Sequence, residues 1–402
     1  MKKQLKTRIV SLFFAVWLCF YAAIGAIAEE NVMPIQSTQE ECSDLGVVDG
    51  SLNFDCKSVV LMEEKTGAIL YKQNADEALP PASVTKIMTL LLVMEAIEAG
   101  TVHPDTRISV SANAASMGGS QVYLKEGEVM TVEELLKSVI IASANDAAVA
   151  LAEHISGSVS SFVEKMNKKA AQLGMQNTCF ENVTGLDDTA KQHLTSAKDI
   201  AIMSRELIRH EMVLKYSSTW MDTIRNGEFG LTNTNRLVRF YQGCTGLKTG
   251  STAKAGFCVS VTAKRESLSL ICVVMGAESR DARNAIATQL LDWGFATYTL
   301  YQAEPEAISK VRVIGGMQNT CDVAYSGFCL VLPKAELGKV EKKILLPESV
   351  KAPIRQDDEV GSVEFLLQGK TIGTSPITAS EEVKRIGYFE ILWRMISRFL
   401  LV

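Results

Sequence analysis

Two strand-rich segments enclose a helical middle in this chain, and this order constrains the fold more than any single motif. Residues 58–62 and 68–71 flank a glycine turn and predict a pair of strands. Strands of high β propensity return at residues 256–263 and 268–276. Apolar periodicity between them predicts helices over four stretches, residues 83–96, 132–154, 160–173 and 196–210. We therefore expect one α/β unit whose first strands pair with its last, closed by a helix over residues 285–295.

The composition is that of an ordinary globular protein. The chain has 402 residues, enough for two domains of which one is large. Its formal net charge of −5 provides no basic surface for nucleic acid. The four histidines, at positions 103, 154, 193 and 210, have no zinc-binding spacing, so we interpret them as structural. We expect no metal and no other cofactor.

The N-terminus has the pattern of an export signal. Lys2, Lys3, Lys6 and Arg8 precede an apolar stretch over residues 9–23, and small residues at 26–28 offer a cleavage site. The alternative is an uncleaved membrane anchor. Both readings place the body of the protein outside the cytoplasm. We predict a signal peptide over residues 1–28, followed by a polar lead-in over residues 29–50.

The cysteines leave two interpretations open. Of nine cysteines, Cys19 lies in the signal segment, so eight remain in the exported chain. An even number in an exported protein permits disulfides, whereas a core of this size is also stable with buried free thiols. By spacing alone, Cys321 and Cys329 form the most plausible bridge, because they flank a turn-like segment.

The C-terminal quarter differs from the rest of the chain. Short alternating runs from residue 303 predict a small β-sandwich-like domain of about 75 residues, over residues 303–382. Residues 383–402 then form an amphipathic helix, with Phe389 and Trp393 on its apolar side and Arg394 and Arg398 opposed to them. Because arginines are costly inside a bilayer, this helix favours the membrane interface. Docking on its own protein is the alternative.

Two short motifs, Ser-x-x-Lys and Ser-Ala-Asn, occur in the stretches predicted to be helical. Ser83 and Lys86 are three residues apart at the head of an apolar run, so on a helix the amine reaches the hydroxyl. A second Ser-x-x-Lys, at Ser251 and Lys254, lies in a strand-like region where this geometry is not expected. The sequence Ser-Ala-Asn at 143–145 interrupts a long helical stretch, and we prefer it to the copy at 111–113.

A third motif, Lys248-Thr249-Gly250, stands at the head of a predicted edge strand. A glycine in a strand permits close approach of a ligand. The lysine and the threonine offer a charge and a hydroxyl to a carboxylate. Taken alone, this tripeptide is a common turn sequence.

In this order the three motifs resemble those of penicillin-binding proteins and class A β-lactamases. Longer stretches, including 173–178, 194–199, 233–235 and 246–252, resemble the low-molecular-mass serine D-alanyl-D-alanine carboxypeptidases of the S11 type. The resemblance implies the α/β (α+β) transpeptidase fold, an antiparallel sheet packed with a helical cluster, over residues 51–302. It also implies the small all-β domain and the terminal amphipathic helix.

The resemblance assigns a role to each motif residue. Ser83 is the acylated nucleophile, and Lys86 is its base, provided that burial or the neighbouring Lys248 lowers the lysine pKa. Ser143 relays a proton to the leaving D-alanine, and Asn145 binds the substrate amide and orients Lys86. The terminal carboxylate and the oxyanion are bound by the remaining residues of the set, Lys248, Thr249, Gly250, Ser251 and Arg283.

The implied activity is removal of the terminal D-alanine from peptidoglycan pentapeptides, in cell-wall synthesis and remodelling. β-Lactams are expected to acylate Ser83, and the protein is expected on the outer face of the cytoplasmic membrane. One alternative is a class A β-lactamase, but the nearest match to its Glu-x-x-Leu-Asn sequence, residues 211–215, lacks the asparagine. The other is a penicillin sensor that is acylated without turnover.

Overall fold

The computed structural model of the chain describes residues 52–187 and 190–400, with side chains described up to residue 397. The predicted signal peptide and the whole of the predicted polar lead-in lie outside the described residues. Within the described part, strands at both ends of the first 300 residues enclose a helical middle, as the sequence order predicts.

A five-stranded antiparallel sheet forms the framework of this region, in the order β2-β1-β9-β8-β7. Its strands are β1 (Ser58–Glu63), β2 (Ile69–Gln73), β7 (Cys244–Thr252), β8 (Gly256–Arg265) and β9 (Leu268–Ala277). Strand β1 pairs with β9, with Ser58 opposite Met275 and Glu63 opposite Leu270. The expected pairing of the first strands with the last is therefore confirmed, and β7 is an edge strand.

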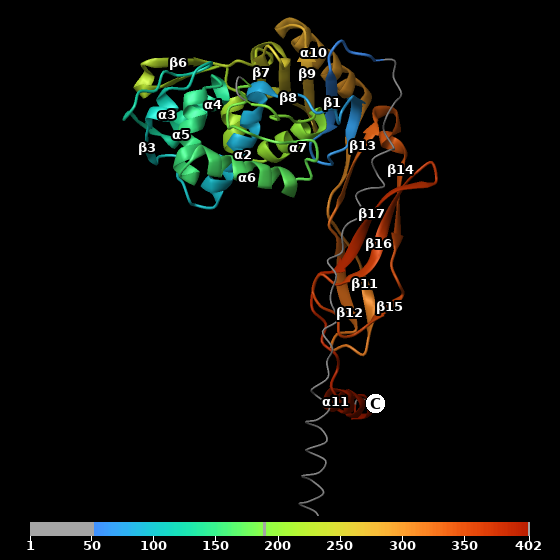
Figure 1. Ribbon diagram of the computed structural model, residues 1–402. Coiled ribbons are helices and arrows are strands. Elements are labelled where there is room, and N and C mark those ends of the chain that lie inside the picture. Colours follow the sequence, from blue (N-terminus) through green and yellow to red (C-terminus); the bar gives the residue numbers. More distant parts are fainter. Residues whose placement is uncertain (1–51, 188–189, 401–402) are drawn as a thin grey trace, which may run out of the picture. The chain divides into compact units, whose positions relative to one another are not determined.

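The two faces of this sheet carry different helices (Figure 1). Alternate residues point to opposite faces of a strand, so Val60, Met62 and Val273 pack on the helical cluster, whereas Leu61 and Val274 pack under α10 (Arg280–Thr297). The cluster consists of α2 (Lys86–Glu98), α4 (Val132–Ile141), α5 (Asn145–Ser156), α6 (Val159–Gln172), α7 (Ala197–Leu207) and α8 (Glu211–Ser217).

Short elements connect these helices and strands. They are η1 (Ala82–Thr85), β3 (Arg107–Ser109), α3 (Ala112–Ala115), β4 (Val129–Thr131), β5 (Met221–Ile224), η2 (Arg225–Gly227), β6 (Phe229–Thr232) and α9 (Leu237–Phe240). The nucleophile candidate Ser83 lies on the 3₁₀ turn η1, and the α-helix begins only at Lys86. The predicted break at Ser143 is confirmed: α4 ends at Ile141 and α5 begins at Asn145.

The remaining chain is all-β up to its last helix. Its strands are β10 (Tyr298–Ala303), β11 (Glu306–Ile314), β12 (Thr320–Tyr325), β13 (Phe328–Pro333), β14 (Val340–Leu345), β15 (Ser349–Lys351), β16 (Glu359–Leu367) and β17 (Lys370–Ala379), with η3 (Lys334–Lys339) between β13 and β14. Six of them form one sheet in the order β14-β16-β17-β12-β11-β15, and β10 pairs with β13. Phe365, Tyr325 and Ile377 lie in the core of this domain.

The suggested bridge between Cys321 and Cys329 is wrong. Both are free thiols, as are the other cysteines of the described residues. Cys321 lies on β12 of the six-stranded sheet and Cys329 on β13 of the two-stranded pair, so the turn between them does not bring them together.

The last element, α11 (Tyr388–Leu400), leaves its apolar side chains uncovered. Phe389 is 83% exposed and Trp393 is 68% exposed. Among the residues that the structure describes, no helix combines the length and the apolarity needed to cross a bilayer.

Candidate active site

Ser83 is presented on a tight turn that the edge strand β7 braces from one side. The preceding Ala82 adopts a left-handed conformation, with φ of 49°. A Cβ atom at Gly250 would lie 2.8 Å from Ser83 N and 2.9 Å from Pro81 O. Real Cβ atoms do not approach backbone atoms so closely, so the glycine of Lys-Thr-Gly is required for the contact between β7 and the nucleophile turn.

His193 stabilises the same turn through a hydrogen bond to Thr85. Glu181 N donates to Nδ1 of His193 at 2.9 Å, so Nε2 carries the proton and donates to Thr85 Oγ1 at 2.7 Å. Thr85 Oγ1 in turn donates to Ala82 O at 2.8 Å. Burial lowers the pKa of His193 to about 4, which keeps the ring neutral. The histidine is structural, as we interpreted it, but it stands one hydrogen bond away from the nucleophile turn.

Lys86 has the geometry and the environment of a base. Its Nζ atom lies 2.9 Å from Ser83 Oγ and donates to Thr184 O at 2.9 Å. The side chain is fully buried, and this burial, together with the nearby Lys248, lowers its pKa well below the usual value, while Asp146 opposes the shift. A neutral amine at hydrogen-bond distance can accept the serine proton.

A second lysine lies next to the second serine. Lys248 Nζ donates to Ser143 Oγ at 2.7 Å and to Thr249 O at 3.0 Å. Burial, and then the positive charge of Arg283, lower the pKa of Lys248 to about 7. Ser143 has a φ of 63° between α4 and α5, so the helix break predicted from the sequence presents its hydroxyl to Lys248.

Asn145 has one satisfied and one unsatisfied end. Its Nδ2 atom donates to Gly118 O at 2.7 Å, whereas its buried Oδ1 atom has no hydrogen-bond partner among the described residues. A buried acceptor without a partner costs about 1–3 kcal/mol, so this oxygen is available for a ligand amide. Within the described chain no hydrogen bond joins Asn145 to Lys86, so the orienting contact that the resemblance implies is not present here.

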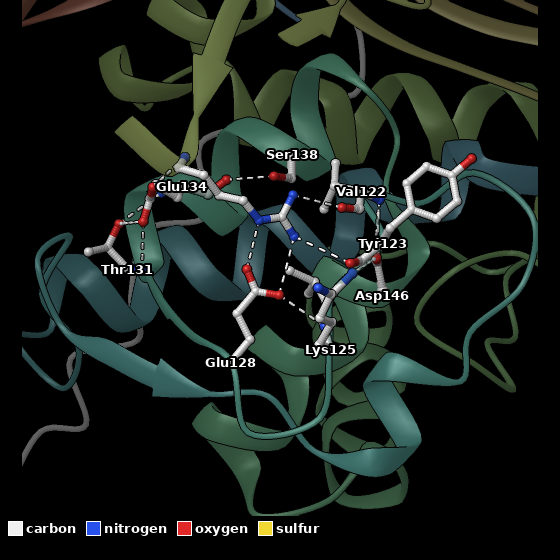
Figure 2. Close-up of polar contacts among 10 residues, drawn as sticks. Val122, Tyr123, Lys125, Glu128, Thr131, Glu134, Ser138 and Asp146 are labelled. Carbon is white, nitrogen blue, oxygen red and sulfur yellow. Dashed lines mark hydrogen bonds and ion pairs between the residues drawn. The ribbon is translucent and has the colours of Figure 1, made fainter. Parts of the chain in front are cut away.

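The segment over residues 116–128 is held over this helix break by a polar network that we did not predict (Figure 2). The buried Asp146 carboxylate accepts from Val122 N at 3.1 Å and from Leu124 N at 3.0 Å. Arg225 donates to Glu128 Oε1 at 2.7 Å and to Val122 O at 2.9 Å. No motif marks Asp146 or Arg225; the only signal was an aspartate inside an apolar helical stretch.

Arg283 lies in the wall of the site and not on the surface. It is 3% exposed, and its guanidinium group donates to Cys258 O at 3.2 Å. Burial, and then the charge of Arg280, lower the pKa of Arg283 to about 10. With Ser83, Ser143, Thr249, Gly250 and Ser251, it lines a cleft of about 640 Å³. The structure therefore brings the candidate residues from all three motifs to one place.

The competing copies of the motifs do not form sites. Lys254 Nζ donates to Asp187 O at 3.0 Å and Ser251 stands at the exposed end of β7, so these two are not a nucleophile and its base. Ser111 caps α3, and its hydroxyl donates to Glu153 Oε2 at 2.5 Å. The described residues contain no group of three or more His, Cys, Asp or Glu side chains arranged to hold a metal ion.

Comparisons with known proteins agree with this geometry. Residues 47–279 match the family model described as D-alanyl-D-alanine carboxypeptidase of peptidase family S11, and residues 295–385 match the model of the penicillin-binding protein 5 C-terminal domain. The D-alanyl-D-alanine carboxypeptidase DacF of Bacillus subtilis is 43% identical over 351 residues, covering 85% of this chain and 90% of the relative. DacC of Escherichia coli is 33% identical, covering 85% of this chain and 87% of the relative.

Solved structures show the same similarity. Penicillin-binding protein 5 from Haemophilus influenzae superimposes with a TM-score of 0.75 at 32% identity, covering 84% of this chain and 99% of the other. Penicillin-binding protein D2 from Listeria monocytogenes, in its ampicillin-bound form, gives a TM-score of 0.57 at 32% identity, covering 61% of this chain and 99% of the other.

Proposed function

Because the chain belongs to the D-alanyl-D-alanine carboxypeptidase family S11, we propose that the cleft around Ser83 removes the terminal D-alanine from peptidoglycan pentapeptides. The observation that carries this proposal is the 2.9 Å separation between Ser83 Oγ and a buried Lys86 Nζ whose pKa is lowered well below its usual value. The amine takes the serine proton as Oγ bonds to the carbonyl carbon of the penultimate D-alanine.

The leaving amine needs a proton, and Ser143 is placed to supply it. Its hydroxyl accepts a hydrogen bond from Lys248 at 2.7 Å, and Lys248 has a pKa of about 7, so a proton is readily passed between them near neutral pH. The backbone N–H groups of Ser83 and Ser251 are our candidates for the oxyanion hole, a role that depends on backbone position and not on side-chain type. Water then hydrolyses the Ser83 ester.

The terminal carboxylate of the substrate is the group that fits the cationic end of the cleft. Thr249 and Arg283 line this end, the buried Lys248 lies behind it with its amine on Ser143, and Gly250 lets the strand approach the nucleophile turn closely. Charge-assisted hydrogen bonds to a carboxylate are about twice as strong as neutral ones. On the penultimate residue, the unpaired Oδ1 of Asn145 is our candidate acceptor for the substrate amide.

β-Lactams are the second expected ligand class, because they present an acylating carbonyl beside a carboxylate. We expect penicillin to form an ester with Ser83. Two alternative activities make different predictions: a β-lactamase hydrolyses the adduct rapidly, and a sensor keeps it without releasing D-alanine from peptides.

The test combines three measurements on the full-length protein. D-Alanine release from diacetyl-L-Lys-D-Ala-D-Ala is expected for the parent protein and absent from Ser83→Ala. Intact-mass analysis is expected to find one penicilloyl group per chain on the parent and none on the variant. Fast nitrocefin turnover would instead support a β-lactamase, and a stable adduct with no D-alanine release would support a sensor.

We further propose that the protein is exported by residues 1–28 and works on the outer face of the cytoplasmic membrane, with residues 51–302 as the catalytic domain, 303–382 as the β domain and 383–402 as an interfacial anchor. The exposed Phe389 and Trp393 support an interfacial position for α11. Cosedimentation with anionic lipid vesicles tests the anchor: binding is expected for the full chain and lost after Phe389→Ser with Trp393→Ser. Equal binding of both proteins would contradict it.

A further inference from the structure

A short turn over residues 182–186 lies against the turn that carries Ser83. Gly185 has a φ of 82°, a conformation that glycine adopts without steric cost. A Cβ atom at this position would overlap Ala82 O and would lie 2.7 Å from Thr85 Oγ1, so the two turns meet through a glycine. We refer to residues 182–186 as the base turn, because it also contacts the base.

Two consecutive carbonyl groups of the base turn accept hydrogen bonds from α2. Thr184 O accepts from Lys86 Nζ at 2.9 Å, and Val183 O accepts from Thr89 Oγ1 at 2.8 Å. Lys86 and Thr89 are three residues apart, so they share a face of the helix. Val183 and Thr184 are both buried. The base turn is therefore docked on the face of α2 that carries the base.

The contact with Thr184 O determines how the amine of Lys86 is oriented. A neutral amine has two N–H bonds and one lone pair, and only the lone pair can accept the proton of Ser83. Within the described chain, the hydrogen-bond partners of Lys86 Nζ are Ser83 Oγ and Thr184 O. Because Thr184 O accepts one of the N–H bonds, the lone pair can be directed at Ser83 Oγ.

The side chain of Asn182 holds the base turn in this shape. Its Oδ1 atom accepts from Thr184 N at 3.1 Å, from Thr184 Oγ1 at 3.2 Å and from Gly185 N at 2.7 Å. Its Nδ2 atom donates to Leu186 O at 2.8 Å. An asparagine that bonds the backbone two and three residues ahead fixes a local turn. The place of Thr184 O therefore depends on one half-buried side chain.

We propose that Asn182 is a positioning residue for the reaction: it fixes the base turn so that Thr184 O directs the amine of Lys86 toward Ser83. The proposal rests on the serine carboxypeptidase function above and adds no chemical step to it. Asn182 lies outside the lining of the cleft, so it acts through Lys86 and not through the substrate.

The experiment uses the full-length protein and two assays. Acylation by benzylpenicillin is followed by intact-mass analysis of quenched samples over a range of pH, and D-alanine release is measured with diacetyl-L-Lys-D-Ala-D-Ala. Asn182→Ala is expected to lower the acylation rate constant about tenfold, the effect of one lost hydrogen bond to a charged group. With the peptide, the loss should appear in kcat and not in KM, because the residue does not line the cleft.

Asn182→Asp is the conservative variant. Its carboxylate keeps an acceptor for the same three donors, so it should recover most of the rate that Asn182→Ala loses. Thr184 O favours the charged form of Lys86, as any acceptor of its protons does. The acid limb of acylation should therefore move to lower pH in Asn182→Ala, which loosens this acceptor, and to higher pH in Asn182→Asp, which adds a negative charge nearby. Lys248 and Asp146, the charged groups that act on Lys86, are unchanged in both.

Asn167→Ala is the matched control. Asn167, on α6, also holds the backbone with both ends of its amide: Oδ1 accepts from Phe180 N at 2.8 Å, and Nδ2 donates to Phe180 O at 2.8 Å. Phe180 lies two residues before the base turn. The control should therefore unfold more easily than the parent, while its acid limb stays in place.

The outcomes separate the two proposals. A parent protein that neither releases D-alanine nor is acylated overturns the proposed function itself. With an active parent, the positioning role is overturned if Asn182→Ala acylates at the parent rate, or if its acid limb stays in place as in Asn167→Ala. If Asn182→Ala does not fold, Asn182→Asp decides: an acid limb at higher pH supports the proposal, and one at the parent pH overturns it.

Discussion

Replacing Arg283 by glutamine tests how the cleft holds the substrate carboxylate. The arginine is 3% exposed and anchored by its bond to Cys258 O, so its charge is fixed in the wall of the cleft, near enough to Lys248 to lower the pKa of that lysine. A hydrogen bond to a charged group contributes about 1.5–3 kcal/mol. Since about 1.4 kcal/mol corresponds to a factor of ten, Arg283→Gln should lower kcat/KM for a D-Ala-D-Ala peptide about 10- to 100-fold.

The same change has a second, independent signature. The positive charge of Arg283 is one of the two causes that lower the pKa of Lys248 to about 7, so its removal raises that pKa. The pH at which Lys248 loses its proton therefore moves upward, and the alkaline limb of the kcat/KM profile should move with it. A loss caused only by damaged packing would reduce the height of the profile and leave this limb in place.

The assay is D-alanine release from a D-Ala-D-Ala peptide and from the same peptide with a terminal carboxamide. The parent enzyme should discriminate strongly against the carboxamide, and Arg283→Gln should lose most of that discrimination, because both changes remove the same contact. Arg209→Gln, an exposed arginine that pairs with Glu206 and does not line the cleft, is the control. Equal losses on the two peptides in Arg283→Gln would refute the assignment of this arginine to the carboxylate.

Three further predictions concern the residues around the nucleophile. Gly250→Ala should destabilise the protein by about 1–3 kcal/mol and slow acylation by penicillin, because its Cβ would lie 2.8 Å from Ser83 N. Gly230→Ala has open space around it and should change neither the stability nor the acylation rate. A normal acylation rate in Gly250→Ala would contradict the close approach. Asp146→Asn should lower the pKa of Lys86 further, because the carboxylate raises it, and should therefore move the acid limb of the acylation rate to lower pH. The protein should also unfold more easily, because Val122 N and Leu124 N lose an acceptor. An acid limb that moves to higher pH would be inconsistent with the effect of Asp146 on Lys86. His193 has a pKa of about 4 in the folded protein against 6.5 in the unfolded chain, so its contribution to stability is complete above about pH 6.5. As the pH falls to about 4, this contribution decreases by about 3 kcal/mol, at 1.36 kcal/mol per pKa unit. The unfolding free energies of the parent and of His193→Gln, from denaturant titrations, should therefore converge over that interval, and parallel curves would argue against a buried neutral histidine.

The sequence allowed the framework and the three motif corners to be predicted because both depend on short-range patterns. The apolar periodicity of α2 and the helix break at Ser143 can each be read from a short stretch of neighbouring residues. The side chains of Ser83 and Lys86 meet even though Ser83 lies on a 3₁₀ turn, because residues three apart also share a side of that turn. The bridge between Cys321 and Cys329 failed because spacing says nothing about which sheet each strand joins.

The residues that the sequence did not reveal act across long stretches of chain. His193 meets Thr85 over 108 positions, and Arg225 meets Glu128 over 97, so no local pattern connects them. Asp146 could be read as an ordinary polar position next to Asn145, and only its burial and its bonds to the segment over residues 116–128 give it a role. Likewise Trp220, which precedes β5, and Phe240, which lies in α9, bring their rings together only in the folded chain.

The two buried lysines also make the base respond to its substrate. Lys248 has a pKa of about 7, so near neutral pH it is only partly charged in the free enzyme. A carboxylate bound beside it favours its charged form, and a charged Lys248 is one of the causes that lower the pKa of Lys86. Substrate binding therefore drives Lys86 further toward the neutral amine that accepts the Ser83 proton. It follows that the acid limb of kcat, which reports the bound enzyme, should lie at lower pH than the acid limb of kcat/KM, and that a substrate with a terminal carboxamide should not show this separation. Coincident limbs for the carboxylate substrate would mean that the two lysines titrate independently, and the base would then owe its neutrality to burial alone.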